Sequence, residues 1–334
     1  MKNSLKLMFR SFWLSCLLLG CISNQKQKNE IAFDTSILKV NEKDDIYKLI
    51  NNECSATFKI KGAEMISLKA NNIEYIWFGD PEVWSGQAPI LFPIVGRLKD
   101  HEYLFKGQTY TMKQHGFARD NNFKVVAKTD NSITFEQIAT KESKAIYPFD
   151  FVLQVKYTLK GKTLLTKYIV KNPSVSEELY FSIGAHPSFN CPFEANQKRN
   201  EYQLVFDKKI APKFQTNING IYEGHTKDVF KDKGILDLPD TIFDDKSLAL
   251  SPNVFSKVTF VHKPTKKPYL SVNFKGFPFL GIWSISNTSP FICIEPWYGI
   301  ADRKYQNKDF TKKEGVQKLN PQSTFETSFS ISIL

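Results

Sequence analysis

The stretch "FVLQVKYTLKGKTLLTKYIVKNP", residues 151–173, gives the clearest indication of the fold class. Between Leu153 and Leu159 apolar and polar residues alternate, which is the period of a strand with one buried face. Gly161 is a turn signal, a second segment rich in β-branched and aromatic residues follows it, and Pro173 ends that segment. The stretch therefore predicts an antiparallel β-hairpin.

Similar short segments fill the chain from Tyr47 to its end, separated by turn residues at a spacing of about ten residues. They include "SITFEQIA", "YQLVFD", "KVTFVHK", "YLSVNFKG", "FLGIWSIS" and "STFETSFSISIL". No window of about 15 residues has the period of a helix, and only the region from Glu42 to Asn51 is expected to hold one short helix. The sequence predicts an all-β chain with a large antiparallel β-sandwich or barrel-like domain.

The number of domains follows from what separates the segments. Tandem small β domains are the alternative to one large domain, and they would require a repeat or a linker. The sequence has neither an internal repeat nor a stretch rich in Pro, Gly and Ser that would divide it. Since β-rich chains of this length often fold as one unit, we expect residues 31–334 to form a single domain.

The N-terminus has the features of an export signal. Two lysines and an arginine precede the apolar segment "FWLSCLLLG", which is too short to span a membrane. Its end, "LLGC", matches the bacterial lipoprotein box, in which the cysteine, here Cys21, becomes the lipidated N-terminus. Residues 1–20 are therefore predicted to be a lipoprotein signal peptide and residues 21–30 a polar tether. The prediction is an exported protein anchored by lipid on the periplasmic or cell-surface side of a membrane. An ordinary signal peptide with a chance cysteine is the alternative.

Charge and cysteine content exclude other classes. The formal net charge is +11, but the lysines are scattered and no basic block alternates with aromatic residues, so nucleic-acid binding is not expected. After Cys21 there remain Cys54, Cys191 and Cys293, which permit one disulfide; Cys293 is expected to pack as a small hydrophobe. No CxxC or paired-histidine spacing predicts a metal site.

One carboxylate interrupts an apolar strand in "FICIEPWYGIAD", residues 291–302. A buried Glu295 is costly unless it is paired or lines a polar pocket. His186 in "FSIGAHPSFNCP" and His115 in "KQHGFARD" lie where strands end, although such histidines are often structural. Arg97, which follows Gly96 in "APILFPIVGRL", either pairs with Glu295 or donates hydrogen bonds to a ligand.

These four segments resemble, in order and approximate spacing, those of the aldose 1-epimerases, the galactose mutarotase superfamily, and most of all the bacterial branch with hexose-6-phosphate mutarotase relatives. The resemblance covers the chain from about Tyr47 to Leu334. It implies one antiparallel β-sandwich with a sugar cleft on a concave sheet. It also implies Glu295 as general base and His186 as general acid.

The remaining implied site residues bind the sugar. Arg97 and His115 match the family's ligands of the sugar hydroxyls, and Trp297 is expected to form an aromatic wall. The family's aspartate matches Asp240, with Asp244 as a rival. The resemblance implies no metal and no other cofactor.

The implied activity is the interconversion of the α and β anomers of a free hexose, with a small sugar as the only expected partner besides the lipid-anchored membrane. A hexose-6-phosphate 1-epimerase is the enzymatic alternative, because Arg97 and Arg119 are able to hold a phosphate. The predicted export disfavours it, since sugar phosphates are kept in the cytoplasm. Without catalysis, the same sequence features fit a non-catalytic carbohydrate-binding lipoprotein or a purely structural β-sandwich lipoprotein.

Overall fold

The hairpin expected at residues 151–173 forms two long antiparallel strands. Strands β11 (Val152–Lys160) and β12 (Thr163–Lys171) pair along their whole length, from Val152 opposite Lys171 to Lys160 opposite Thr163. Buried and partly exposed positions alternate along β11, as the sequence pattern indicates. The computed structural model describes residues 37–41, 45–244 and 247–334, and these described residues belong to one compact unit.

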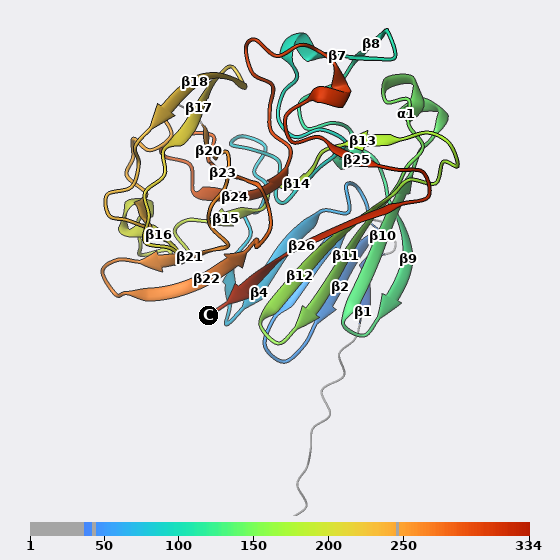
Figure 1. The fold of residues 1–334 in the computed structure, drawn as a ribbon. Coiled ribbons are helices and arrows are strands. Elements are labelled where there is room, and N and C mark those ends of the chain that lie inside the picture. Colours follow the sequence, from blue (N-terminus) through green and yellow to red (C-terminus); the bar gives the residue numbers. More distant parts are fainter. Residues whose placement is uncertain (1–36, 42–44, 245–246) are drawn as a thin grey trace, which may run out of the picture. The chain divides into compact units, whose positions relative to one another are not determined.

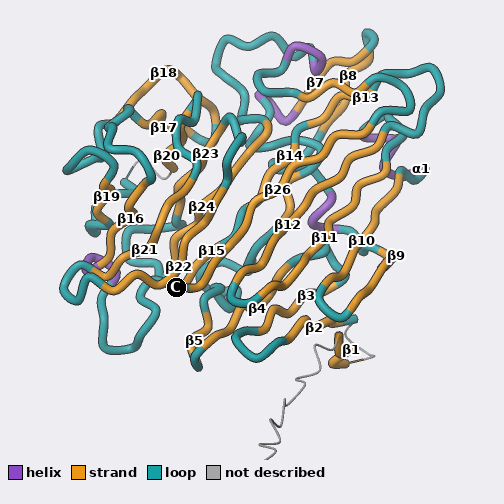
Figure 2. The backbone as a smooth tube through the Cα atoms, turned by 60° about the horizontal axis from the view of Figure 1, so that its bottom comes forward, coloured by secondary structure: helices purple, strands orange, loops and turns teal. Residues whose placement is uncertain are grey.

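This hairpin belongs to a nine-stranded sheet (Figure 2). Its order is β19 (Ile235–Asp237), β16 (Tyr202–Phe206), β21 (Lys257–His262), β22 (Lys267–Asn273), β26 (Thr324–Ile333), β12, β11, β10 (Ser132–Ile138) and β9 (Lys124–Thr129). The ladders between neighbours are antiparallel. The final alternating segment of the chain thus lies between two hairpins that are far apart in sequence.

Two further sheets complete the layers (Figure 1). The five-stranded sheet runs in the order β1 (Ile37–Asn41), β2 (Ile46–Ile50), β3 (Ser55–Lys59), β4 (Met65–Ala70) and β5 (Ile73–Glu74). The eight-stranded sheet runs in the order β18 (Ile221–Lys227), β17 (Phe214–Ile218), β20 (Ser247–Leu250), β23 (Phe279–Trp283), β24 (Phe291–Tyr298), β14 (Ile183–Ala185) and β6 (Ile90–Leu91), and β15 (Ser188–Asn190) also pairs with β24. The expected all-β antiparallel sandwich is confirmed.

Smaller elements connect the layers. Two ribbons pair β7 (Glu102–Phe105) with β8 (Gln108–Thr111) and β13 (Leu179–Phe181) with β25 (Gln317–Leu319). The helical elements are α1 (Lys141–Ile146) and the 3-10 turns η1 (Lys99–His101), η2 (Ala118–Asp120), η3 (Arg199–Glu201) and η4 (Phe310–Lys312). None of the helices in the described ranges has the length and apolar character needed to cross a bilayer.

The core lies between the layers. Phe58 of β3 stacks on Tyr157 of β11 at 4.2 Å between ring centroids, which joins the five-stranded to the nine-stranded sheet. Phe189 of β15 meets Phe260 of β21 edge-on at 5.8 Å, which joins the eight-stranded to the nine-stranded sheet. One continuous cluster of buried residues includes all four rings. The nine-stranded sheet therefore covers both other sheets with one face.

The short helix expected between Glu42 and Asn51 is wrong where the structure describes that region. Residues 46–50 form β2, which pairs residue by residue with β3 from Ile46 to Ile50. The segment "IYKLI" is rich in β-branched and aromatic residues, and the ladder on β3 overrides the acidic start. Cys54, Cys191 and Cys293 are all free thiols. The predicted signal peptide, tether and Cys21 lie outside the described residues.

Candidate functional site

Strand β24 is buried on both faces. Seven of its eight residues are buried, which explains why its sequence is apolar almost throughout instead of alternating. Ile292 and Ile294 face the main core. On the other face, Phe291 and Cys293 pack with Trp77. Glu295 follows them at the next position of that same face, because strand residues two apart share a face.

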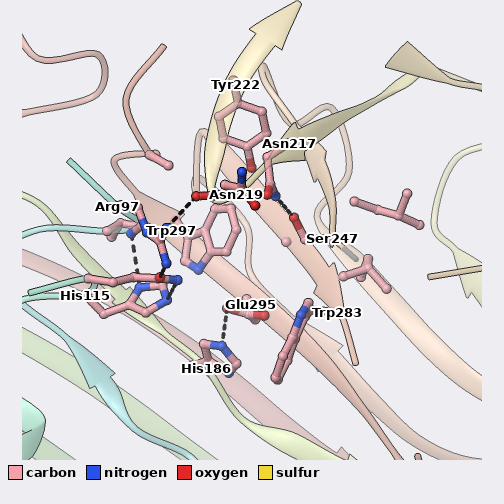
Figure 3. A pocket seen from close by; sticks show the side chains of 18 of the residues that line it. Arg97, His115, His186, Asn217, Asn219, Tyr222, Ser247, Trp283, Glu295 and Trp297 are labelled. Atoms are coloured by element: carbon pink, nitrogen blue, oxygen red, sulfur yellow. Dashed lines mark hydrogen bonds and ion pairs between the residues drawn. The ribbon is translucent and has the colours of Figure 1, made fainter. Parts of the chain in front are cut away.

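The segment "GAHPSFN" places His186 opposite Glu295. Strand β14 pairs with residues 297–298 of β24, and β15 pairs with residues 291–293. The segment that joins β14 to β15 therefore lies opposite Glu295. Pro187 interrupts the ladder there, because proline has no N–H to donate. Its carbonyl still accepts a hydrogen bond of 3.3 Å from the backbone N–H of Ile294. This break turns the imidazole of His186 toward the carboxyl group of Glu295 (Figure 3).

The two side chains form a buried acid–base pair. Nε2 of His186 lies 3.2 Å from Oε2 of Glu295, and the two residues are 6% and 2% exposed. The distance is within the range of an ion pair, but Oε2 of Glu295 makes no hydrogen bond among the described residues. Nδ1, the other ring nitrogen of His186, has no hydrogen-bond partner there either. Buried polar atoms usually have partners, so these two are available to a ligand.

Burial decides which protonation state the pair adopts. Removal from water raises the pKa of Glu295 well above its ordinary value of 4.5. The same effect is the main reason why the pKa of His186 is lowered to about 3. A backbone hydrogen bond acts in the opposite direction, and the positive charge of Arg119 contributes a smaller lowering. Burial therefore favours the uncharged form of each group, the protonated carboxyl of Glu295 and the neutral imidazole of His186.

Trp297 forms the floor of the site beside Glu295. Its indole lies over the two neighbouring strands, where an ideal Cβ on Gly184 would come within 2.6 Å of the ring and one on Gly281 within 2.3 Å. Only glycine at both positions leaves room for the ring to lie flat on the sheet. The indole Nε1 is buried and has no partner in the described part of the chain. An aromatic plane of this kind is suited to the apolar face of a sugar ring.

Two further tryptophans flank His186. The rings of Trp84 and Trp283 lie 5.1 Å and 5.3 Å from the imidazole, centroid to centroid. They contact each other at 5.2 Å, edge to face. These rings keep the imidazole in place and reduce the water around it, which is the physical reason for its lowered pKa.

Arg97 and His115 form one flank. The backbone N–H of Gly96 donates to Nδ1 of His115 at 3.1 Å, and the N–H of His115 donates to the carbonyl of Gly96 at 2.9 Å. Gly96 has φ +74°, and a Cβ there would collide with Ala301. Burial holds the pKa of His115 well below its ordinary value, so the ring is neutral. Arg97 donates to the carbonyl of Asn219 at 2.7 Å and makes no ion pair with Glu295.

The opposite flank is neutral and polar. Asn217 donates a hydrogen bond to Ser247, and Tyr222 lies close to both (Figure 3). Together with Arg97, His115, Arg119, the acid–base pair and the three tryptophans, these side chains line one cavity of about 430 Å³. That volume lies within the usual range for small-molecule sites. The sequence contained no readable signal for Trp84, Trp283, Asn217, Tyr222 or Ser247, because each is brought to the site from another part of the chain.

A buried ion pair lies next to the backbone of both flanks and connects them. Nζ of Lys313 lies 2.7 Å from Oδ1 of Asp302, and the two side chains are 2% and 3% exposed. Oδ2 of Asp302 accepts from the N–H of Lys99 at 2.9 Å. The backbone of Asp302 donates to the carbonyl of Arg97 at 2.9 Å and accepts from the N–H of Tyr222 at 3.0 Å. The end of the segment "YGIAD" therefore joins the arginine flank to the neutral flank.

The structure brings together five of the six side chains expected in the site: Glu295, His186, Arg97, His115 and Trp297. Asp240 and its rival Asp244 do not line the cavity. Both are exposed, and they accept hydrogen bonds from Asn200 and Asn287 respectively. Residues in other segments, Asn217 among them, form the neutral flank of the cavity.

Comparisons with known proteins agree with this geometry. The chain is 34% identical over 308 residues to the chromosomal protein LacX of Lactococcus lactis subsp. lactis, which covers 86% of this chain and 99% of that protein. A galactose mutarotase related enzyme from Lactobacillus acidophilus has a similar structure, with a TM-score of 0.81, 34% identity, and coverage of 86% of this chain and 97% of its own. A galactose mutarotase-like protein from Lactobacillus casei has a TM-score of 0.80 at 30% identity, with coverage of 86% and 100%.

The family assignment rests on more than these relatives. The sequence profile of the aldose 1-epimerases matches residues 45–313, a range that includes both residues of the acid–base pair and both cavity flanks. The resemblance expected from the four sequence segments is confirmed. The chain belongs to the aldose 1-epimerase family.

Proposed function

We propose that the protein is a mutarotase that interconverts the α and β anomers of a free hexose. The observation that carries this proposal is the contact of 3.2 Å between His186 and Glu295, buried beside an indole floor in a cavity of suitable size. Membership in the aldose 1-epimerase family supports an isomerase acting on a sugar. One acid and one base on the same cavity wall are what anomer exchange requires.

The reaction begins with opening of the ring. Glu295, as the carboxylate, takes the proton of the anomeric hydroxyl, while protonated His186 gives a proton to the ring oxygen. The bond between the anomeric carbon and the ring oxygen breaks, and the anomeric carbon becomes an aldehyde. The pair now consists of protonated Glu295 and neutral His186, which is the form that burial favours.

Ring closure reverses the proton transfers. Rotation about the bond next to the carbonyl presents its other face to the hydroxyl that re-forms the ring. Neutral His186 takes the proton of that hydroxyl, and protonated Glu295 returns a proton to the carbonyl oxygen. The total number of protons on the pair is unchanged, so the enzyme is ready for either anomer. Each positioned acid or base contributes roughly 10²–10⁴ to the rate.

The remaining cavity residues hold the sugar in this proposal. Trp297 contacts an apolar face of the ring, and Arg97 and His115 donate hydrogen bonds to hydroxyl groups from one flank. Asn217 and Ser247 bind hydroxyl groups on the neutral flank. Asp240 and Asp244 are given no sugar contact, because neither reaches the cavity.

Polarimetry tests the proposal. Freshly dissolved α-D-glucose or α-D-galactose should relax to the equilibrium rotation faster with the protein than in buffer alone. Relaxation at the buffer rate for every common aldose would favour a carbohydrate-binding protein without catalysis, which measurable binding of the same sugars without turnover would then support.

A hexose 6-phosphate is the second candidate substrate. Arg97 and Arg119 both line the cavity, and two guanidinium groups are well suited to a phosphate. Relaxation of glucose 6-phosphate and of glucose should be compared at equal concentrations. A rate constant per active site that is higher for the phosphate, and an Arg119→Met variant that loses only this preference, would select this candidate.

Lipid anchoring at Cys21 remains a prediction from the N-terminal sequence. A Cys21→Ser variant expressed from the full-length gene should appear in the soluble fraction, whereas the unaltered protein should sediment with membranes. Sedimentation of the variant with membranes would contradict the predicted anchor.

A further inference from the structure

A third potential ligand group lies beside the acid–base pair and has no part in the proposed reaction. Cys293 is two residues before Glu295 on the same face of β24, and it is fully buried. One donor atom each of His186, Cys293 and Glu295 lie within 4.8 Å of one another. No local sequence pattern indicates this group, because the imidazole comes from the β14–β15 bend more than a hundred residues earlier.

The three donors are also free to accept a ligand. Oε2 of Glu295 and Nδ1 of His186 are buried polar atoms without hydrogen-bond partners in the described ranges. Cys293 is a free thiol. Since buried polar atoms are nearly always paired, two such atoms on residues beside a buried thiol are an unusual concentration of unused lone pairs.

We infer that His186, Cys293 and Glu295 form a binding site for a thiophilic divalent cation such as Zn²⁺, and that this cation blocks the acid–base pair. One imidazole, one thiolate and one carboxylate form a donor set of the kind that zinc accepts, whereas Mg²⁺ and Ca²⁺ require oxygen ligands. Three protein ligands leave the fourth zinc position open to water or to a sugar hydroxyl on the cavity side.

The geometry requires a small closure. Bonds of about 2.0–2.3 Å in a tetrahedral site place the donor atoms roughly 3.3–3.7 Å apart, compared with the present limit of 4.8 Å. Movement of the three side chains by about 1 Å closes this difference. The shell of Trp84 and Trp283 around His186 already excludes water from one side. Binding releases the thiol proton to solvent, and it occupies lone pairs that the catalytic proton transfers need.

Metal binding is measured without any enzyme assay. In equilibrium dialysis the folded protein should bind about one Zn²⁺ per chain, and Mg²⁺ should not compete. Titration with Cd²⁺ should produce the ultraviolet charge-transfer absorption of a cadmium–thiolate bond. Zn²⁺ should also raise the thermal unfolding temperature, since it binds the folded state.

Two cysteine variants identify the ligand. Cys293→Ala should lose the cadmium–thiolate band and weaken Zn²⁺ binding at least tenfold. Cys54→Ala removes a thiol that is also buried but precedes β3 and does not belong to the His186–Cys293–Glu295 group. This control should keep both the cadmium–thiolate band and the Zn²⁺ affinity. Cys293→Ser serves as a second variant should the alanine variant not fold. A cadmium–thiolate band or full zinc affinity in folded Cys293→Ala or Cys293→Ser protein would overturn the site.

The inhibitory effect rests on the proposed mutarotase activity, and its failure is distinguishable from a failure of that activity. Zn²⁺ should slow anomer relaxation, a chelator should restore it, and Cys293→Ala should need at least tenfold more Zn²⁺ for the same inhibition. Zinc binding with no mutarotation at all would reject the proposed function and keep the metal site. Mutarotation that is insensitive to bound Zn²⁺ would keep the function and overturn the blocking role.

Discussion

The β11–β12 hairpin and strand β24 are both antiparallel and rich in apolar residues, yet they bury their side chains in different ways. Along β11 every second residue is buried, because only one face meets the core. Along β24 almost every residue is buried, because the second face is covered by tryptophans and the cavity. The charged side chains of the hairpin reach water, whereas Glu295 on β24 does not.

The contrast shows where polar groups acquire a function. Glu326 on β26, the neighbour of β12, pairs with Lys167 at 2.7 Å, with both side chains at least one third exposed. Glu295 meets the imidazole of His186 and retains an oxygen without a hydrogen-bond partner in the described ranges. A carboxylate on the open face is solvated and replaceable, but a carboxylate on the closed face keeps an altered pKa and an accessible lone pair.

The largest effect on activity is expected when a glutamate is replaced by glutamine in each of the two regions. Glu295→Gln should lower the mutarotation rate constant by about 10²–10⁴, because an amide cannot accept the anomeric proton. Glu326→Gln should leave the rate unchanged, since its ion pair lies on the nine-stranded sheet, away from the cavity. Polarimetry of both purified variants measures this. Full activity in Glu295→Gln would contradict the assignment of the base.

Ion pairs provide the second comparison. Lys313→Met should lower the free energy of unfolding by about 3–5 kcal/mol, because it leaves the buried carboxylate of Asp302 without its charge partner. Lys167→Met breaks an exposed pair and should cost less than about 1 kcal/mol. Urea denaturation of both variants checks the difference. Equal costs would show that the Asp302–Lys313 pair is not an effective support of the cavity.

The sequence predicts the β11–β12 hairpin more completely than it predicts the site. Alternation between Leu153 and Leu159 is sufficient to predict a one-sided strand, because burial on one face leaves a period of two. The helix predicted over β2 is wrong, because the acidic start of that region was given more weight than its β-branched residues and the ladder on β3.

For the site, four segments with strong local patterns supplied Glu295, His186, Arg97 and His115. The aspartate was not identified, because no local motif fixes the alignment around Asp240. The neutral flank at Asn217 and the support from Lys313 were not predictable, since each depends on a contact between segments far apart in the chain. Family resemblance assigned roles, but only the fold shows which side chains share one cavity.

Substitutions at the indole of Trp297 and at the glycine beneath it should have a third, smaller effect, on stability. Gly281→Ala places a methyl group where the ring of Trp297 lies, and such overpacking typically costs about 1–3 kcal/mol. The smaller ring of Trp297→Phe should relieve part of this cost, so the double variant should lose less stability than the sum of the single variants. Additive losses in chemical denaturation would show that the glycine is not needed for the indole.

The last effect is the pH dependence that follows from burying His186. Its pKa is about 3 in the folded protein against an ordinary 6.5, so between these values the unfolded chain binds more protons. The contribution of His186 to the free energy of unfolding should therefore fall as the pH decreases below 6.5, by up to about 1.4 kcal/mol for each pH unit. His186→Asn should remove this contribution, so that the variant gains stability relative to the unaltered protein as the pH falls toward 5. His225→Asn, on the exposed part of β18, controls for loss of an imidazole.

Glu295 acts on the pH dependence in the opposite direction. Its raised pKa makes the folded protein bind more protons than the unfolded chain above pH 4.5, so stability is lost as the pH rises through that pKa. Unfolding curves of Glu295→Gln, measured over the same pH range, should lack this loss of stability with rising pH. If variants of Glu295 and His186 kept the pH dependence of the unaltered protein, water would reach the pair, and the contrast between the closed face of β24 and the open face of the hairpin would not hold.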